Sequence, residues 1–201
     1  MQIDTETYKT KEFNHYKTQI AKTQIVIGTS LRKDHNHIVR LQHKDYGETK
    51  KSNTYTISRE GTIYQHFDNK FHSDFLNIKE ADKKLISLVI ENMGCLFKTQ
   101  NDKYINWLNE VCDEDKVINK TWLGYSYWEM FIDKQLESVM LLCKDLCEKH
   151  NIPNVCMDFH HYHKDTIKFK GIVFRSNYIE DSSDINPLFD IVKFNEELKN
   201  D

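Results

Sequence analysis

Short apolar runs, separated by glycine or polar turns, recur along the chain. Residues 23–28 are β-branched and end in glycine, which predicts a buried strand. Residues 55–58 and 62–67 alternate apolar and polar side chains around Gly61, and this pattern predicts a hairpin because glycine tolerates the positive φ of a tight turn. Residues 85–91 are apolar on both faces until the last position, as expected for a central strand covered on both sides.

The strongest helical pattern covers residues 133–150, where apolar residues recur at spacings of three and four. Asp133 is a candidate cap, and Pro153 follows the end. Weaker patterns predict helices over 34–43, 101–112 and 191–198, and the apolar run 171–174 predicts a last strand.

This order of elements predicts an α/β fold with a central mixed β-sheet of about five strands flanked by helices. We expect a single domain over residues 1–201, since no linker or repeat interrupts the chain. Residues 1–22 form a polar N-terminal extension, and an aromatic-rich insertion lies around 101–130.

Composition narrows the class of protein. The 28 Lys and Arg residues against 31 Asp and Glu residues leave a net charge of −3, which provides no positive field for nucleic acid. No apolar run reaches the roughly 18 residues of a membrane span. The first residues lack a secretion signal, so we expect a protein that is cytoplasmic at synthesis. Five cysteines without CxxC spacing argue against a disulfide framework and a zinc knuckle.

Ten histidines raise the question of a metal site, because imidazole is a common zinc ligand. They cluster at His35 and His37 and at 160–163, where neighbouring side chains point in different directions, so we interpret most of them as loop residues. The chain has no Gly-rich phosphate loop, GxSxG elbow or HExxH helix, which sets serine hydrolases and phosphate-loop enzymes aside.

The order of several blocks resembles zinc-dependent N-acetylmuramoyl-L-alanine amidases of the type 2, peptidoglycan-recognition-protein-like superfamily, particularly the bacteriophage-encoded members. The blocks are the strand 24–27, the hairpin 55–65, the triplet 71–73, the strand 88–94, the helix end 151–153, and the segments 175–178 and 183–190. The resemblance implies the amidase fold over about residues 23–194. It also implies cleavage of the amide between N-acetylmuramic acid and L-alanine by a water molecule on zinc, which two histidines and an acid or cysteine hold.

The ligand positions depart from this pattern. The first histidine aligns with Gly28, which has no side chain, and the second aligns with Arg175, a fixed cation that would repel zinc. Asp184 matches the third ligand, and Glu91 matches the strand-end carboxylate that serves the bound water in some members. We therefore expect no zinc and predict an ion pair of Arg175 with Asp184 or Glu91, since a guanidinium suits a carboxylate.

A second alignment register keeps a zinc site open as an alternative. His160 or His161 follows the 151–153 turn at about the spacing of the family's second histidine, and His35 or His37 would replace the first. Together with Asp184 these residues would supply three ligands, which leaves the fourth position for water.

Three functions remain open. The first is a degenerate amidase-like domain that binds a peptidoglycan fragment or a protein, for example as a phage-encoded or virion-associated component. The second is an active amidase with substituted zinc ligands, and the third is a pure protein-interaction scaffold, since a fold does not fix a function. If the family groove persists, its exposed border is predicted at Thr29, Asn53, His72, Asn92, Arg175 and Asn177.

Overall fold

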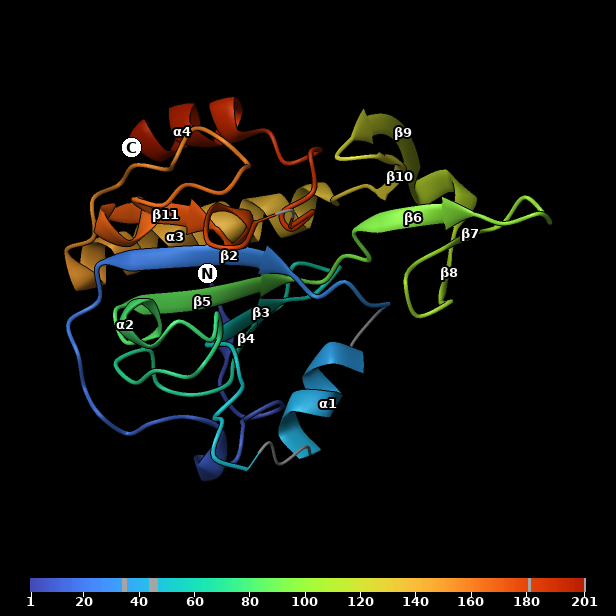
Figure 1. Ribbon diagram of the computed structural model, residues 1–201. Helices are drawn as coiled ribbons and strands as arrows, with labels where there is room; N and C mark the ends of the chain where they lie inside the picture. Colours follow the sequence, from blue (N-terminus) through green and yellow to red (C-terminus); the bar gives the residue numbers. More distant parts are fainter. Residues whose placement is uncertain (34–35, 44–46, 181, 201) are drawn as a thin grey trace.

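The computed structural model describes residues 1–33, 36–43, 47–180 and 182–200, and it contains two β-sheets (Figure 1). The main sheet has the strand order β1-β4-β3-β5-β2-β11. Its strands are β1 (Ile3–Asp4), β2 (Gln24–Thr29), β3 (Tyr55–Ile57), β4 (Ile63–Gln65), β5 (Leu85–Ile90) and β11 (Gly171–Phe174). Strands β3, β5, β2 and β11 run parallel, so their carboxyl ends meet at one edge of the sheet.

Helices cover both faces of this sheet. They are α1 (Asn36–His43), α2 (Lys79–Asp82), α3 (Asp133–His150) and α4 (Ile191–Lys199). Ile25 and Ile27 of β2 belong to the buried cluster that includes α3 and α4, whereas Val26 belongs to the cluster on the α2 side. This alternation follows from the two-residue period of a strand, and it explains why the central strands are apolar on both faces.

The sequence-predicted fold class is confirmed, with six strands in the main sheet where about five were expected. The hairpin is β3 and β4, and Gly61 has a φ of +82° at its turn. A Cβ at Gly61 would lie 2.7 Å from the Lys134 carbonyl oxygen, so this position requires glycine. The five cysteines are free and buried, and no described helix is long and apolar enough to cross a membrane.

The aromatic-rich insertion forms a second, antiparallel sheet beyond the carboxyl ends of β2 and β5 (Figure 1). Its order is β8-β7-β6-β10-β9, with β6 (Cys95–Lys98), β7 (Tyr104–Ile105), β8 (Val111–Cys112), β9 (Val117–Trp122) and β10 (Tyr125–Glu129). The helix expected over 101–112 is therefore wrong. The Asn106 side chain accepts hydrogen bonds from the Leu108 and Glu110 backbones, and this turn folds β7 against β8.

Two helix starts differ from expectation. The weak pattern over 34–43 is helical from Asn36, and residues 34 and 35 lie outside the described part of the chain. Asp133 is the first residue of α3 and not its cap. The Gln135 side chain instead accepts a hydrogen bond from the Ile132 N–H, which satisfies a donor at the helix start.

The N-terminal extension packs against the main sheet. β1 pairs in parallel with β4 at the sheet edge, and the Thr10 N–H donates to the His66 carbonyl oxygen. Tyr16 forms a β-bridge with His72, and their rings stack. These backbone contacts make residues 1–16 part of the fold although their composition is polar.

An ion pair joins the two sheets. Arg59, in the β3–β4 turn, donates from Nη1 and Nη2 to the two carboxylate oxygens of Glu129 at 2.5 and 3.0 Å. The Glu129 side chain is 2% exposed, and its Oε2 also accepts from the Met93 N–H where the chain passes from β5 to β6. The hairpin, the strand junction and β10 are thus tied at one buried carboxylate.

Candidate functional site

Three elements bring Gly28, Arg175 and Asp184 together at the carboxyl edge of the main sheet. Phe174 pairs with Ile27 in the β11–β2 ladder, so the next residues, Arg175 and Gly28, lie side by side. A Cβ built at Gly28 would lie 3.0 Å from Asp184 Oδ2 and 3.4 Å from Arg175 Cβ. The three positions that the alignment assigned to zinc ligands therefore converge in space.

Asp184 is fixed from one side and paired from the other. Its Oδ1 accepts hydrogen bonds from the Thr29 N–H at 2.6 Å and from the Thr29 hydroxyl at 2.8 Å. Its Oδ2 lies 3.6 Å from Arg175 Nη1, which confirms the predicted ion pair. Burial raises the pKa of Asp184, while Arg175 and the Thr29 bonds oppose this shift.

These residues do not fit the zinc ion that the family resemblance implies. Glycine offers no donor at position 28, and the Arg175 guanidinium carries a permanent positive charge. Of the three residues, only Asp184 has a side chain that can bind zinc, whereas catalytic zinc sites use three protein ligands. In the part of the chain that the structure describes, no three His, Cys, Asp or Glu side chains are grouped as a metal site.

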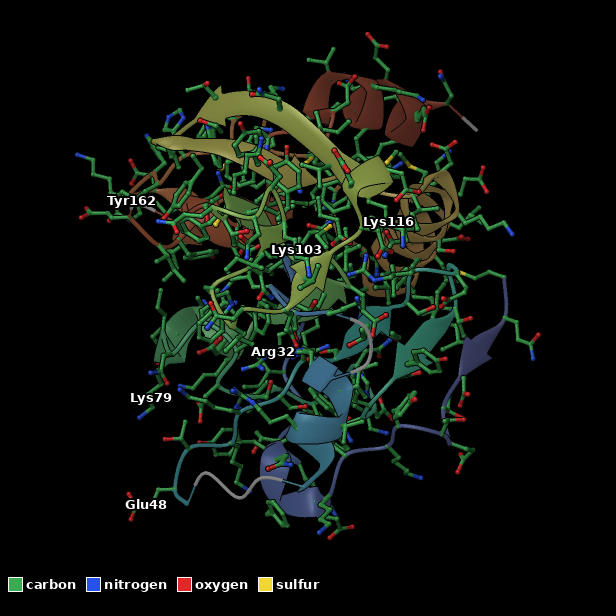
Figure 2. The ribbon with its side chains drawn as sticks, turned by 90° about the vertical axis from the view of Figure 1, so that its right-hand side faces the viewer. Arg32, Glu48, Lys79, Lys103, Lys116 and Tyr162 are labelled. Carbon is green, nitrogen blue, oxygen red and sulfur yellow. The ribbon has the colours of Figure 1, made fainter. Side chains whose placement is uncertain are left out.

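A pocket of about 410 Å³ opens beside this pair, and we call it the arginine pocket. It lies between the main sheet, α1 and the second sheet, and Figure 2 shows Arg32 above α1 and below Lys103, which directly precedes β7. Its lining residues are Thr29, Ser30, Leu31, Arg32, His37, Arg40, Lys51, Ser52, Asn53, Asp74, Phe75, Leu76, Asn77, Val89, Trp107 and Arg175. Trp107 forms the wall from the second sheet, where its indole N–H donates to the Leu31 carbonyl oxygen.

A chain of hydrogen bonds leads from the pocket into the core. His66 Nδ1 lies 2.7 Å from the Tyr8 carbonyl oxygen, so it must carry the proton that it donates. His66 Nε2 then accepts from the Thr56 hydroxyl at 2.8 Å, because burial lowers the pKa of His66 to about 4 and keeps the ring neutral. Thr56 in turn accepts from Asn53 Nδ2 at 2.8 Å, which leaves Asn53 Oδ1 as an acceptor.

His37 ends this chain at the pocket. Its Nε2 lies 3.0 Å from Asn53 Oδ1 and must therefore donate. Desolvation lowers the pKa of His37 to about 4, so the imidazole is neutral at pH 7 and Nδ1 holds the lone pair.

We predict that nitrogen-15 NMR finds His37 as the neutral Nε2–H tautomer from pH 8 down to about pH 5, with protonation only near pH 4. The Thr56→Val variant should leave His37 in this tautomer, because Asn53 Nδ2 still donates to the Tyr55 carbonyl oxygen at 2.7 Å and Asn53 Oδ1 stays directed at His37. His163, an exposed histidine, provides the reference signal in the same spectra. An imidazolium signal from His37 at pH 6 would contradict the assignment.

The predicted groove residues divide into two groups. Thr29, Asn53 and Arg175 line the arginine pocket, whereas His72 lines a neighbouring pocket that shares Asp74 and Asn77 with it. The expected exposure is wrong for Thr29, Asn53 and His72, which are buried because their side chains contact Asp184, Thr56 and Tyr16.

Asn92 and Asn177 were expected to be exposed there, and this expectation is wrong, because both are fully buried. The Asn92 amide donates to the Glu129 and Met130 carbonyl oxygens, and the Asn177 amide donates to those of Phe159 and His161. Both side chains therefore satisfy buried backbone.

Glu91 follows β5 and is 1% exposed. Its N–H donates to the Ile57 carbonyl oxygen, and its own carbonyl oxygen accepts from Gln135 Nε2 at 2.8 Å. Its backbone is thus fixed at the carboxyl edge of the sheet, but Glu91 is not among the residues that line the arginine pocket. A catalytic role for its carboxylate stays a hypothesis.

The alternative zinc ligands do not meet among the described residues. His160 and His161 line a hollow with Leu123 and Tyr162, and the His160 ring stacks on Phe174. His37 lines the arginine pocket instead, and His35 lies outside the described residues.

The sequence analysis did not predict most of the pocket lining. The missed residues include Arg32, Arg40, Lys51 and Trp107, which lie in segments without a recognisable motif. Only the position of Arg32 could have indicated the pocket. Arg32 follows the first buried strand by a few residues, and a cation at this position would lie at the carboxyl edge of a parallel sheet, where ligands bind.

The parallel strands, the helices on both faces and the site at the carboxyl edge define the amidase type of mixed α/β domain. The sequence model of the N-acetylmuramoyl-L-alanine amidase family (type 2) matches residues 16–170. The chain therefore belongs to this family. A search of curated proteins gave no match.

Solved structures share the fold at low sequence identity. The catalytic domain of XlyA superposes with a TM-score of 0.59 at 14% identity and covers 98% of this chain and 99% of its own. The amidase LysC from Clostridium intestinale URNW gives a TM-score of 0.55 at 13% identity, with 98% and 97% covered. AmiD from E. coli, in complex with the substrate anhydro-N-acetylmuramic acid-L-Ala-D-gamma-Glu-L-Lys, gives 0.57 at 13% identity, with 96% and 62% covered.

Proposed function

We propose that this protein is an amidase-fold domain that binds a peptidoglycan fragment in the arginine pocket and does not hydrolyse it through zinc. The observation that carries the proposal is the convergence of Gly28, Arg175 and Asp184. Gly28 and Arg175 occupy the two positions at which a zinc site would need neutral ligands such as histidine, and Arg175 already pairs with Asp184, the remaining acid.

Peptidoglycan is the ligand class that the family and the AmiD complex suggest. The pocket suits such a ligand because its lining includes the cationic side chains of Arg32, Arg40 and Lys51. Guanidinium and ammonium groups can donate hydrogen bonds to sugar hydroxyls and peptide carbonyl oxygens. A phage accessory or virion component with this binding function is compatible with the proposal.

Two measurements test the proposal. Elemental analysis of dialysed protein should find no stoichiometric zinc, and no amide cleavage should follow when zinc and muropeptide are added. A muropeptide titration followed by backbone amide NMR should give saturable shifts at Thr29, Asn53 and Trp107 in the wild type, and weaker ones in Arg175→Ala.

One tightly held zinc ion with amidase activity would replace the proposal by the active-enzyme alternative. No saturable shift at millimolar ligand, where a site of about −4 kcal/mol is half filled, would leave the protein-interaction scaffold.

A further inference from the structure

Three of the ten histidines lie along one contact between the N-terminal segment 1–16 and the body of the domain, and we call this contact the histidine seam. His15 belongs to the segment, whereas His66 and His72 follow β4. All three residues are buried, with exposed fractions of 6%, 1% and 9%. The regular structure of the segment is limited to β1 and the 3-10 turn Glu12–Asn14, so contacts along the seam hold much of it in place.

The two histidines of the body bind the backbone of the segment. The Thr10 N–H donates to the His66 carbonyl oxygen, and His66 Nδ1 lies 2.7 Å from the Tyr8 carbonyl oxygen. The Tyr16 N–H donates to the His72 carbonyl oxygen at 2.7 Å, and the Tyr16 and His72 rings stack with their centroids 4.9 Å apart. Both ends of the stretch from Tyr8 to Tyr16 are therefore held at a histidine.

Two ring nitrogens of the seam are buried without a hydrogen-bond partner. The His15 ring stacks on Phe67 at 4.8 Å and on Phe71 at 5.8 Å between ring centroids. Its Nδ1, like that of His72, has no partner among the described residues. A neutral imidazole can keep a lone pair there, whereas the protonated ring would carry an N–H and a positive charge with no acceptor. Burial of such an unpaired charge is costly.

The charged groups that face His15 do not favour its protonation. Burial lowers the pKa of His15, and Lys50 and Lys17 lower it further, while Glu12 opposes them. Lys50 is held close, because its Nζ donates to the His15 carbonyl oxygen at 3.2 Å. Two cations thus face this ring against one acid.

His72 has similar surroundings on the other side of the seam. Burial lowers its pKa, and Lys22 and Lys83 act in the same direction, while the Thr18 backbone and Asp74 oppose them. Burial also lowers the pKa of His66 to about 4, against the Tyr8 backbone. The docked segment therefore keeps all three rings neutral at pH 7.

We propose that acid releases the N-terminal segment 1–16 from the main sheet at the histidine seam, as a local opening that precedes unfolding of the sheet. In the released state the rings are hydrated and regain the ordinary histidine pKa of about 6.5. The released state then binds more protons than the docked state, so the docked state loses stability as the pH falls below about 6.5.

The opening reaches the edge of the candidate site. The Tyr16 hydroxyl donates to Asp74 Oδ2 at 2.9 Å, and Asp74 lines both the arginine pocket and the neighbouring pocket of about 600 Å³. Release of the segment removes Tyr16 from the wall of this neighbouring pocket. The proposal concerns the fold and does not depend on which ligand the arginine pocket binds.

Hydrogen exchange of backbone amides between pH 7 and pH 5 tests the proposal. Protection factors, which correct for the intrinsic effect of pH on exchange, should fall about tenfold or more at Thr10 and Tyr16. The amides of β2 and β5 should keep their protection. In nitrogen-15 spectra, the His15 and His72 rings should become imidazolium over the same pH range.

The variant His15→Phe/His72→Phe retains flat rings for the stacks and removes two protonation sites. Its Thr10 and Tyr16 amides should remain protected at pH 5, whereas His163→Gln, which changes an exposed histidine, should lose protection as the wild type does. If the double variant is already unprotected at pH 7, the wild-type ring signals decide the question, and neutral rings at the pH of opening would overturn the proposal. Protection of both amides that persists at pH 5, or that is lost together with β2 and β5, would also overturn it.

Discussion

The double variant Gly28→His/Arg175→His is expected to hold one zinc ion with a dissociation constant of about 1 µM or lower, which corresponds to about −8 kcal/mol. The Cβ position at Gly28 lies 3.0 Å from Asp184 Oδ2 and 3.4 Å from Arg175 Cβ, so two imidazoles and a carboxylate would converge there. Three such ligands with an open fourth position form a usual catalytic zinc set.

The backbone can accept this change. Gly28 lies within β2 and is not among the glycines with positive φ, so a side chain is compatible with its conformation. The tightest contact would be with Asp184 Oδ2, which has no hydrogen-bond partner among the described residues and can shift, while Oδ1 stays bound to Thr29. Removal of the Arg175 guanidinium also removes the charge that would repel the metal.

Elemental analysis after dialysis and a competition titration with a chelating dye measure the result. Each single variant lacks one ligand and should retain less than a tenth of an equivalent of zinc, as should the double variant with Asp184→Asn added. If the double variant is folded by circular dichroism and still takes up no zinc, Gly28 and Arg175 do not occupy the family's ligand positions.

The carboxyl edge of the sheet was predictable because it depends on a regular pattern. Parallel strands place the residues that follow them at one edge, so Arg175 and Asp184 could be paired from the alignment of blocks alone. The apolar runs and the 133–150 periodicity fixed the core for the same reason, since burial imposes a period on the sequence.

The pocket lining was not predictable, because it joins side chains that share no period. Arg40 is on α1, Lys51 precedes β3, and Trp107 comes from the β7–β8 turn, which the apolar spacing suggested was helical. The prediction for Asn92 and Asn177 was wrong for a different reason. Each residue follows a buried strand, as a ligand-binding residue would, but its side-chain amide donates hydrogen bonds to buried backbone carbonyl oxygens. A sequence gives the position of a polar group more readily than its hydrogen-bond partner.

Loss of the Arg59–Glu129 ion pair is expected to have the largest effect on stability. Arg59→Met would leave the Glu129 carboxylate, which is 2% exposed, without its cation. Breaking a buried pair from one side typically costs about 3–5 kcal/mol, because the remaining charge is desolvated and unpaired. In urea denaturation followed by tryptophan fluorescence, the unfolding free energy should fall by this amount with little change in the slope.

The control is Lys149→Met, which removes the exposed pair with Asp145 in α3 and should cost about 1 kcal/mol or less. Glu129→Gln should cost less than Arg59→Met, because the amide oxygen can still accept from the Met93 N–H and no buried charge is left unpaired on that side. Equal small losses in Arg59→Met and Lys149→Met would show that the pair does not hold the sheets together.

Hydrogen exchange of the backbone amides provides a second measurement. Glu129 is the last residue of β10, and Trp107 of the same sheet contacts Arg32 at the pocket. In Arg59→Met we expect faster amide exchange in β6 and β10, because the second sheet, which forms one wall of the pocket, should open before the main sheet unfolds.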